Sequence, residues 1–146
     1  MIIRSMMIND YEAVYSLWTH TPGMGLNTVD DTREAISRYL ARNPNTCFVA
    51  EDDGSIVGVI LCGHDGRRGF IYHTAVSVTH RGQGIGKQLV AHAIDGLRRE
   101  GISKTALLAF RKNTLGNAFW DSQGFPSRED IVYHEKQLIA FQKIET

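Results

Sequence analysis

The residue types best suited to chemistry gather in one short glycine-rich stretch, Arg81–Lys87, which contains three glycines and two cations. It follows an apolar, strand-like run over Phe70–Val78 and opens a predicted helix. The apolar residues of that helix recur at helical spacing, at Ile85, Leu89, Val90, Ala93, Ile94 and Leu97. The first amides of a helix lack intrahelical partners, and the helix dipole adds partial positive charge there. The pattern predicts a pyrophosphate site; the alternative is a glycine-rich turn without a ligand.

The glycine spacing excludes two common phosphate-binding loops. A dinucleotide-binding fold needs G-x-G-x-x-G and an acidic residue at the end of the next strand. Here the glycines follow the pattern G-x-G-x-G, and no such acidic residue is found. A P-loop needs G-x-x-x-x-G-K-[ST], but Gly86 and Lys87 are followed by Gln88, and position 81 is arginine. The predicted loop therefore belongs to another class of pyrophosphate site.

Two segments resemble motifs of the GNAT N-acetyltransferase superfamily. The family's motif A, [RQ]-x-x-G-x-[GA], is matched by Arg81, Gly84 and Gly86. The segment Asn113–Phe125 resembles a second motif, N-x-x-A-x-x-F-Y-x-x-x-G-F, with Gly116 in place of Ala and Trp120 in place of Tyr. The resemblance spans most of the chain and is weakest before residue 45 and after residue 126.

The resemblance implies that acetyl-CoA is the acetyl donor and a co-substrate. In the family, the strand before motif A carries a bulge and parts from the strand after the motif A helix, and the pantetheine lies in that gap. The implied cofactor-binding residues line the gap or the adjoining loop: Ala75, Val76, Val78, Arg81, Gly82, Gln83, Gly84, Ile85, Gly86, Lys87, Asn113, Phe119 and Trp120. The alternative for the strand residues is an ordinary core strand, and for Asn113 it is a helix cap alone.

The resemblance also implies direct attack of an amine on the thioester, which needs a base and stabilisation of the leaving thiolate. At pH 7, deprotonating a lysine side chain costs about 4.6 kcal/mol and an α-amine about 1.4 kcal/mol. His73, three residues before Val76, is the best-placed candidate base; the alternative is a histidine packed in the sheet. Trp120 replaces the tyrosine thought to protonate the thiolate. Because an indole does not titrate usefully, solvent, Tyr72 and Tyr133 are the other candidates.

Composition limits the remaining function classes. The 146 residues are expected to form one domain over 1–146. Lys+Arg and Asp+Glu number 16 each, so no net field recruits nucleic acid or an anionic membrane. Cys47 and Cys62, a diagonal pair on adjacent predicted strands, are expected to be reduced and half-buried; the alternative is a disulfide bridge. No metal-ligand spacing, signal peptide or membrane span is found, so we expect a soluble cytoplasmic protein without a metal.

Periodicity and turn signals predict the elements that position these residues. Helices are predicted over 10–19, 31–42, 84–100 and 113–123. Strands are predicted over Met1–Ser5, Thr46–Glu51, Ser55–His64, Phe70–Val78, Lys104–Phe110 and Ile131–Ile139. The run Lys104–Phe110 is expected to be a buried parallel strand. Gly96, inside a helix, costs about 1 kcal/mol relative to Ala, which indicates a close contact. We therefore expect an α/β fold with a mixed, mostly antiparallel central sheet and helices on both faces, which by resemblance is the GNAT fold.

The acceptor is left open between a small-molecule amine and a protein N-terminus. Arg67 and Arg68 are candidates for binding an acceptor carboxylate or phosphate, or else form a solvated turn. Residues 19–29 are long enough for a lid, or form a passive connection. Two other functions are considered: a GNAT-fold acyl-CoA-binding or regulatory module without turnover, and a phosphate-binding protein unrelated to CoA. Members of the family often form homodimers, but no feature of this sequence shows one.

Overall fold

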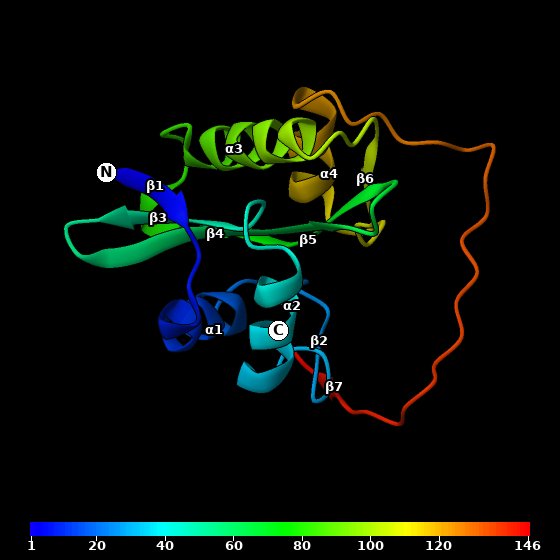
Figure 1. Cartoon of the computed structure of the whole chain (residues 1–146), viewed down its shortest axis with the longest axis horizontal. Helices are drawn as coiled ribbons and strands as arrows, with labels where there is room; N and C mark the ends of the chain where they lie inside the picture. The colour runs from blue at the N-terminus through cyan, green and yellow to red at the C-terminus, as the bar shows by residue number, and fades with distance from the viewer.

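A computed structural model describes all residues, 1–146, and contains a five-stranded sheet with helices on both faces (Figure 1). The sheet order is β1-β3-β4-β5-β6, and β2 and β7 form a separate pair. Only β5–β6 is parallel, which confirms the predicted mixed, mostly antiparallel sheet. The elements are β1 (Ile2–Ser5), η1 (Ile8–Asp10), α1 (Tyr11–Thr19), β2 (Leu26–Asn27), α2 (Arg33–Arg42), β3 (Phe48–Asp52), β4 (Ser55–His64), β5 (Gly69–Val76), η2 (Val78–His80), α3 (Ile85–Arg99), β6 (Thr105–Leu107), α4 (Thr114–Ser122) and β7 (Lys143–Ile144).

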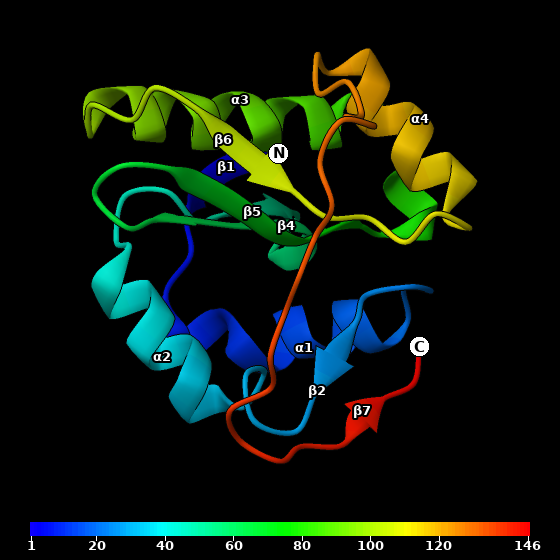
Figure 2. The same ribbon diagram turned by 90° about the vertical axis from the view of Figure 1, so that its right-hand side faces the viewer.

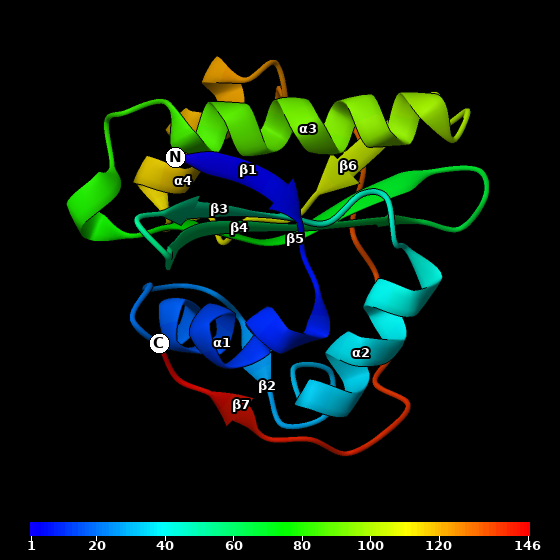
Figure 3. The ribbon, with the colours of Figure 1, turned by 60° about the vertical axis from the view of Figure 1, so that its left-hand side comes forward.

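The helices divide between the two faces of the sheet (Figures 2 and 3). On one face, Val14 and Trp18 of α1 are fully buried in one hydrophobic cluster. On the other face, Leu89 and Ala93 of α3 are fully buried in a second cluster, against which residues of α4 pack. The sheet is therefore the shared wall of two cores. None of the helices is both long enough and apolar enough to cross a membrane.

Turn and cap residues explain where several elements begin and end. Asp53 and Gly54 both have positive φ angles, 50° and 78°, as expected for a tight two-residue hairpin turn between β3 and β4. Thr32 caps α2 by accepting a hydrogen bond from the Ala35 amide at 3.1 Å. Gly101, with a φ of 79°, follows the C-cap of α3. These local signals are the ones the sequence displays, and the corresponding predicted boundaries hold to within a few residues.

The C-terminal part of the chain differs most from the prediction. β6 covers only Thr105–Leu107 and is parallel to β5, as predicted, but none of its residues is buried because it forms the edge of the sheet, so the prediction of a buried strand is wrong. Leu108 and Phe110, beyond its end, are exposed. The strand predicted over Ile131–Ile139 is absent. Instead, residues 126–142, here called the strap, run without regular structure from α4 to β7 (Figure 1). Because α4 and β7 lie on opposite faces of the sheet, the strap crosses the β6 edge rather than lying along it (Figure 2).

The two cysteines are free and fully buried, so the prediction of half-buried side chains is wrong. Cys47 and Cys62 belong to the hydrophobic clusters on opposite faces of the sheet. Burial raises the pKa of each thiol to about 12. Both thiols therefore stay protonated, and poorly reactive, near neutral pH.

Gly96 makes the close contact that its place inside a helix suggested. A Cβ atom built at Gly96 would lie 2.4 Å from the carbonyl oxygen of Asn45, in the segment that leads into β3. Since the obstructing atom belongs to the backbone, no side-chain rotation relieves the clash. The absent side chain lets α3 lie directly against that segment.

Replacing Gly96 with alanine is expected to lower stability, although alanine favours a helix by about 1 kcal/mol. Forcing a methyl group into a packed contact costs about 1–3 kcal/mol, and the opposing backbone puts this site at the upper end. Urea unfolding should show a lower midpoint with an unchanged slope. Gln88→Ala, at an exposed position of the same helix, should leave the midpoint nearly unchanged. A more stable Gly96→Ala variant would contradict the close contact.

Candidate active site

The strands β5 and β6 pair over only three residues and then part. The paired residues are Gly69 with Thr105, Phe70 with Ala106, and Ile71 with Leu107. Beyond them, Tyr72–Val76 of β5 have no strand on the β6 side. Backbone N–H and C=O groups at such an edge need other partners. The parting expected from the family resemblance is therefore present, at the end of β5 that leads toward α3.

A bulge interrupts β5 beside this gap. The register of β4 and β5 shifts so that His73 and Thr74 together oppose the single residue Ile60 of β4. His73 has a φ of 29°, in the positive region that non-glycine residues seldom occupy. The bulge therefore changes the direction of the strand backbone at the position of the candidate base.

The loop before α3 presents a row of free amides. The first bond of the helix runs from the Gln88 amide to the Gly84 carbonyl at 3.1 Å, and the amides of residues 82–87 have no acceptor in the protein. Gly82 and Gly84 have φ angles of 76° and 79°, and no atom lies within 4 Å of a Cβ built on either. These features fit a ligand that brings several phosphate oxygens to the helix start.

The two cations of the loop are exposed. Arg81 is tied back to the strand, since its Nε donates to the Val76 carbonyl at 3.3 Å. Lys87 is paired with no carboxylate in the structure. Val78 lies in the 3-10 turn η2 rather than on β5, and its side chain is exposed. The strand expected to reach Val78 therefore ends at Val76, because the chain turns there toward the loop.

Gly86 differs from Gly82 and Gly84, because its lack of a side chain makes room for another residue of the protein and not for a ligand. A Cβ at Gly86 would lie 3.1 Å from two ring carbons of Phe119 and 3.8 Å from Val76. The first turn of α3, the ring from α4 and the end of β5 thus meet at this glycine. Phe119 therefore supports the loop and the end of the strand from inside the protein.

Asn113 caps α4, which is one of the two roles expected for it. Its Oδ1 accepts a hydrogen bond from the Gly116 amide at 3.0 Å, and its Nδ2 has no partner. A Cβ at Gly116 would lie 2.5 Å from that Nδ2, which explains why glycine suits the position where the family motif has alanine. The Nδ2 group remains able to donate to a ligand.

Trp120 packs among aromatic rings. Its ring centroid lies 5.0 Å from that of Phe119 and 5.2 Å from that of Phe125, both with edge-on geometry. These residues pack against the core on the α3 side of the sheet. Trp120 therefore helps fix α4 and the following turn, a packing role that the sequence motif alone did not indicate.

His73 is held by a buried carboxylate. Its Nε2 lies 2.7 Å from Oδ1 of Asp31, whose side chain is 3% exposed. Asp31 also accepts a hydrogen bond from the Asn27 amide at 2.8 Å. Trp18 packs edge-on against the His73 ring and donates from Nε1 to the His73 carbonyl at 3.2 Å. The arrangement fixes one imidazole nitrogen and leaves Nδ1 without a protein partner.

Asp31 was not a candidate in the sequence, where it lies at the start of a predicted helix. It is 42 residues from His73, and no local motif connects the two. The fold brings them together because α1 and α2 cover the face of the sheet toward which the His73 side chain points. The proximity of Asp31 to His73 therefore arises only in the tertiary structure, and no pattern in the sequence indicates it.

Of the two tyrosines considered as acids, only Tyr72 adjoins the bulge. It is half-exposed on β5, and its burial, together with the charge of Asp30, raises its pKa. Tyr133 lies on the strap, where its hydroxyl donates to Glu135 at 3.0 Å, an interaction that raises its pKa. Tyr72 is thus a protonated phenol near the gap at neutral pH.

The two arginines of the β4–β5 turn are not brought to the gap. Arg67 and Arg68 lie at the paired end of β5, about 15–20 Å from His73 for an extended strand. Asp65 accepts hydrogen bonds from both of their amides at 2.8 Å, and Arg68 also donates to Ser103 at 3.2 Å. The contacts of Arg67 and Arg68 therefore hold the β4–β5 turn together and are not directed toward the gap.

The loop between α1 and β2 does adjoin the gap side of α4. A Cβ at Gly23 would lie 3.9 Å from Asn113 Nδ2, and one at Gly25 would lie 3.5 Å from the Phe110 ring. The segment expected to be a lid or a passive connection thus contacts the turn that leads into α4. It forms a wall beside the mouth of the gap.

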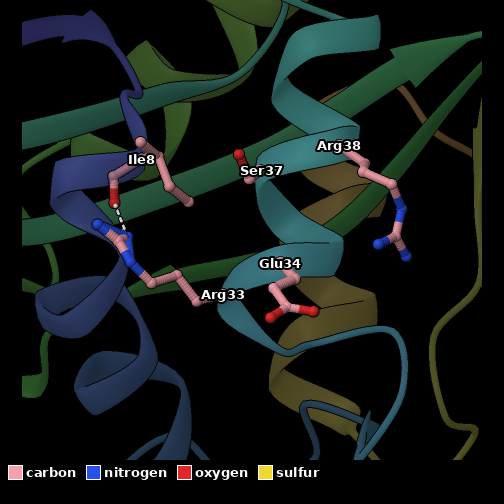
Figure 4. Close-up of a pocket in the computed structure, with 5 residues that line it drawn as sticks. All are labelled: Ile8, Arg33, Glu34, Ser37 and Arg38. Atoms are coloured by element: carbon pink, nitrogen blue, oxygen red, sulfur yellow. Dashed lines mark hydrogen bonds between the residues drawn. The ribbon is translucent and has the colours of Figure 1, made fainter.

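A separate surface hollow of about 460 Å³ lies across the sheet from α3. It is lined by residues of η1 and α2, namely Ile8, Arg33, Glu34, Ser37 and Arg38 (Figure 4). Arg33 is held there by donating to the Ile8 carbonyl at 3.3 Å. The hollow contains none of the predicted site residues. No group of three or more His, Cys, Asp or Glu side chains gathers anywhere to hold a metal.

Comparison with known proteins agrees with this geometry. Residues 11–125 match the model of the acetyltransferase (GNAT) family. An acetyltransferase of Photorhabdus laumondii is 32% identical over 144 residues, which cover 98% of this chain and 99% of that protein. The sequence match thus spans both the free-amide loop and the His73–Asp31 pair.

Solved structures share the fold. The PaiA N-acetyltransferase of Thermoplasma acidophilum, in complex with coenzyme A, has a TM-score of 0.76 at 18% identity and covers 88% of this chain and 91% of its own. AAC(6')-Iy, in complex with the bisubstrate analogue CoA-S-monomethyl-acetylneamine, has a TM-score of 0.71 at 21% identity, with 94% and 98% covered. Given the family match over most of the chain and the relative at 32% identity, the chain belongs to the GNAT acetyltransferase family.

Proposed function

We propose that acetyl-CoA binds with its pyrophosphate on the amides of residues 82–87 and its pantetheine along the free edge of β5. The observation that carries this proposal is that a strand edge without a pairing strand and a row of free amides lie close together in the chain. The free edge ends at Val76, and the row of free amides begins at Gly82. Backbone groups of Ala75 and Val76 would bind the pantetheine amides, while Arg81 and Lys87 would add charge beside the pyrophosphate.

In this proposal, residues at the mouth of the gap make the remaining contacts with the donor. Asn113 has a free Nδ2 that can donate to the pantetheine. Phe119 and Trp120 contribute apolar surface from α4. Val78, in η2 beyond the end of β5, would contribute backbone groups. The bound donor would thus bridge β5, α3 and α4.

The acceptor amine then attacks the thioester directly, with His73 as the general base. With Nε2–H donating to Asp31, the Nδ1 lone pair takes a proton from the acceptor ammonium, and the buried carboxylate stabilises the resulting imidazolium. The amine nitrogen bonds to the acetyl carbon as the carbon–sulfur bond breaks. The leaving thiolate takes a proton from Tyr72 or from solvent, and the attacking nitrogen gives up its second proton to the same donor, which restores it and leaves a neutral amide and the CoA thiol. No covalent enzyme intermediate is needed.

The proposed acceptor is a small-molecule amine or a protein N-terminus. Two solved structures of similar fold support both classes: AAC(6')-Iy holds a bisubstrate analogue made from CoA and acetylneamine, and the NatC complex is bound to a peptide and CoA. The acceptor would enter beside the α1–β2 loop, which forms one wall of the gap. A base such as histidine favours an amine that is deprotonated at small cost, as an α-amine is.

A release assay for the CoA thiol against a panel of amines tests this function. The panel should contain aminoglycosides, polyamines, free amino acids and peptides with free N-termini. Acetylation of at least one class, with one CoA released per acetyl group transferred, is expected. Release of CoA at the same rate with and without every amine would contradict amine acetylation.

Replacing His73 with asparagine should lower kcat/KM by about a hundredfold or more, the usual contribution of a general base. Asparagine tolerates a positive φ better than most residues, so the bulge is kept while the base is lost. The test is kcat/KM between pH 6 and 9 on the best amine. An unchanged rate and an unchanged profile across that range would remove His73 from the mechanism.

The Asp31→Asn variant tests whether Asp31 positions His73 and stabilises its charged form. It keeps an oxygen that can accept from His73 Nε2 but removes the negative charge, so a smaller loss of about tenfold in kcat is expected. CoA affinity, measured by calorimetry, should be preserved in both variants as the control for folding. A loss confined to KM would show that the pair shapes the acceptor site instead of assisting proton transfer.

Lys87→Ala should weaken CoA binding by about tenfold or more, since a hydrogen bond to a charged group contributes about 1.5–3 kcal/mol. Pantetheine, which lacks the pyrophosphate, should bind the variant and the wild type equally. Arg38→Ala, in the hollow of Figure 4, is the matched control and should leave CoA affinity unchanged. Calorimetry with CoA, acetyl-CoA, pantetheine and ATP on the wild type and the two variants checks these outcomes; tight ATP binding without CoA binding would overturn the assignment.

A further inference from the structure

The segment between β5 and α3 is held to the rest of the protein by few backbone bonds. The Ser77 amide donates to the Val57 carbonyl of β4 at 2.8 Å, and the His80 amide donates to the Ser77 carbonyl at 2.9 Å. Beyond His80, the amides of residues 82–87 have no acceptor in the protein. The position of the loop between η2 and α3 therefore depends on side-chain contacts.

His80 makes such a contact with the β3–β4 hairpin. Its Nε2 lies 3.0 Å from Oδ2 of Asp52, the last residue of β3, and its side chain is 24% exposed. Its Nδ1 lies 2.8 Å from Oγ1 of Thr79, which in turn lies 3.1 Å from Oγ of Ser77. With Nε2–H donating to Asp52, Nδ1 accepts from the Thr79 hydroxyl. Both ring nitrogens are therefore occupied, and these contacts fix the orientation of the imidazole.

The alternation of β3 places Asp52 on the same side of the sheet as this loop. Ala50 belongs to the hydrophobic cluster on the α3 side, and side chains two residues apart on a strand face the same side. The tight turn at Asp53 and Gly54 follows directly and fixes the end of the hairpin. In Figure 3 the end of this hairpin and the first turn of α3 lie on the same side of the molecule. Asp52 is therefore a fixed partner for His80.

We propose that His80 and Asp52 form a clamp that holds the loop of free amides in the conformation that accepts the pyrophosphate of the donor. This inference rests on the proposed function, since it concerns how the donor site keeps its shape. His80 directly precedes Arg81 and Gly82, where the loop begins. A loop already fixed in its bound conformation loses less conformational freedom on binding, so its ligand binds more tightly. His80 is thus a positioning residue that acts through the loop.

The clamp contributes to the donor site more than to the stability of the fold. Asp52 is 43% exposed, and exposed ion pairs add little to global stability. The segments that the pair joins are also held without it, because the hairpin is paired along its length and Ser77 is bonded to Val57. Loss of the pair should therefore release the loop and leave the protein folded. The expected effect is a loss of affinity confined to ligands that carry a pyrophosphate.

A double-mutant cycle on CoA affinity, measured by calorimetry with the full chain, tests the clamp. His80→Ala and Asp52→Ala should each weaken CoA binding about three- to tenfold, the cost of ordering a few released side chains. The double variant should be no weaker than either single variant, because each change opens the same contact. His80→Gln, whose side-chain amide can donate to Asp52, should recover most of the affinity. Pantetheine, which lacks the pyrophosphate, should bind all of these proteins equally.

Asp95→Ala is the matched control. Asp95 forms an exposed pair with Arg99 at 2.9 Å, at the end of α3 away from the loop, so its loss should leave CoA affinity unchanged. Equal CoA affinity in the wild type and the clamp variants would overturn the clamp and leave the donor site standing. Additive losses in the double variant, or an equal loss of pantetheine affinity, would also overturn it. A wild type that does not bind CoA would instead contradict the donor site, and the clamp with it.

Discussion

The site depends on one constraint, the loss of pairing between β5 and β6 after Ile71. A parallel strand pair that continued would consume the backbone groups of Tyr72–Val76. Because the strands part, these groups face a gap in which an extended, amide-bearing molecule can take the place of a strand. The free amides at the start of α3 follow within six residues of the end of that edge. Both halves of the proposed donor site are thus backbone surfaces: a strand edge without a pairing strand, and helix-start amides without an acceptor.

Packing behind the gap keeps it in place. Phe119 fills the space that Gly86 leaves free, so α4 supports the first turn of α3. At the other end of the same helix, Gly96 allows α3 to lie against the backbone at Asn45. Both glycines lie within α3, and neither is needed to form a turn. Their common function is to let a helix approach another part of the protein closely, which fixes the loop relative to β5.

The bulge at His73 connects the donor side of the sheet with the α1–α2 side. It changes the direction of β5 beside the gap and lets the His73 ring reach the buried Asp31. That carboxylate comes from the segment before α2, and the ring also packs on Trp18 of α1. The proposed chemistry therefore depends on contacts between the sheet and two helices that cover its other face. The α1–β2 loop, proposed as a wall of the acceptor site, belongs to the same half of the molecule.

The sequence by itself determined the parts of this protein that rest on local rules. Turn residues such as Asp53 and Gly54 located the β3–β4 hairpin, and the spacing of Arg81, Gly84 and Gly86 located the loop of free amides before α3. Local signals act within a few residues, so they could not show that Asp31 meets His73. They also could not show that Ile131–Ile139, with the composition of a strand, has no strand beside it in its own chain. Pairing and burial depend on which segments the fold brings together, and that was decided only by the tertiary structure.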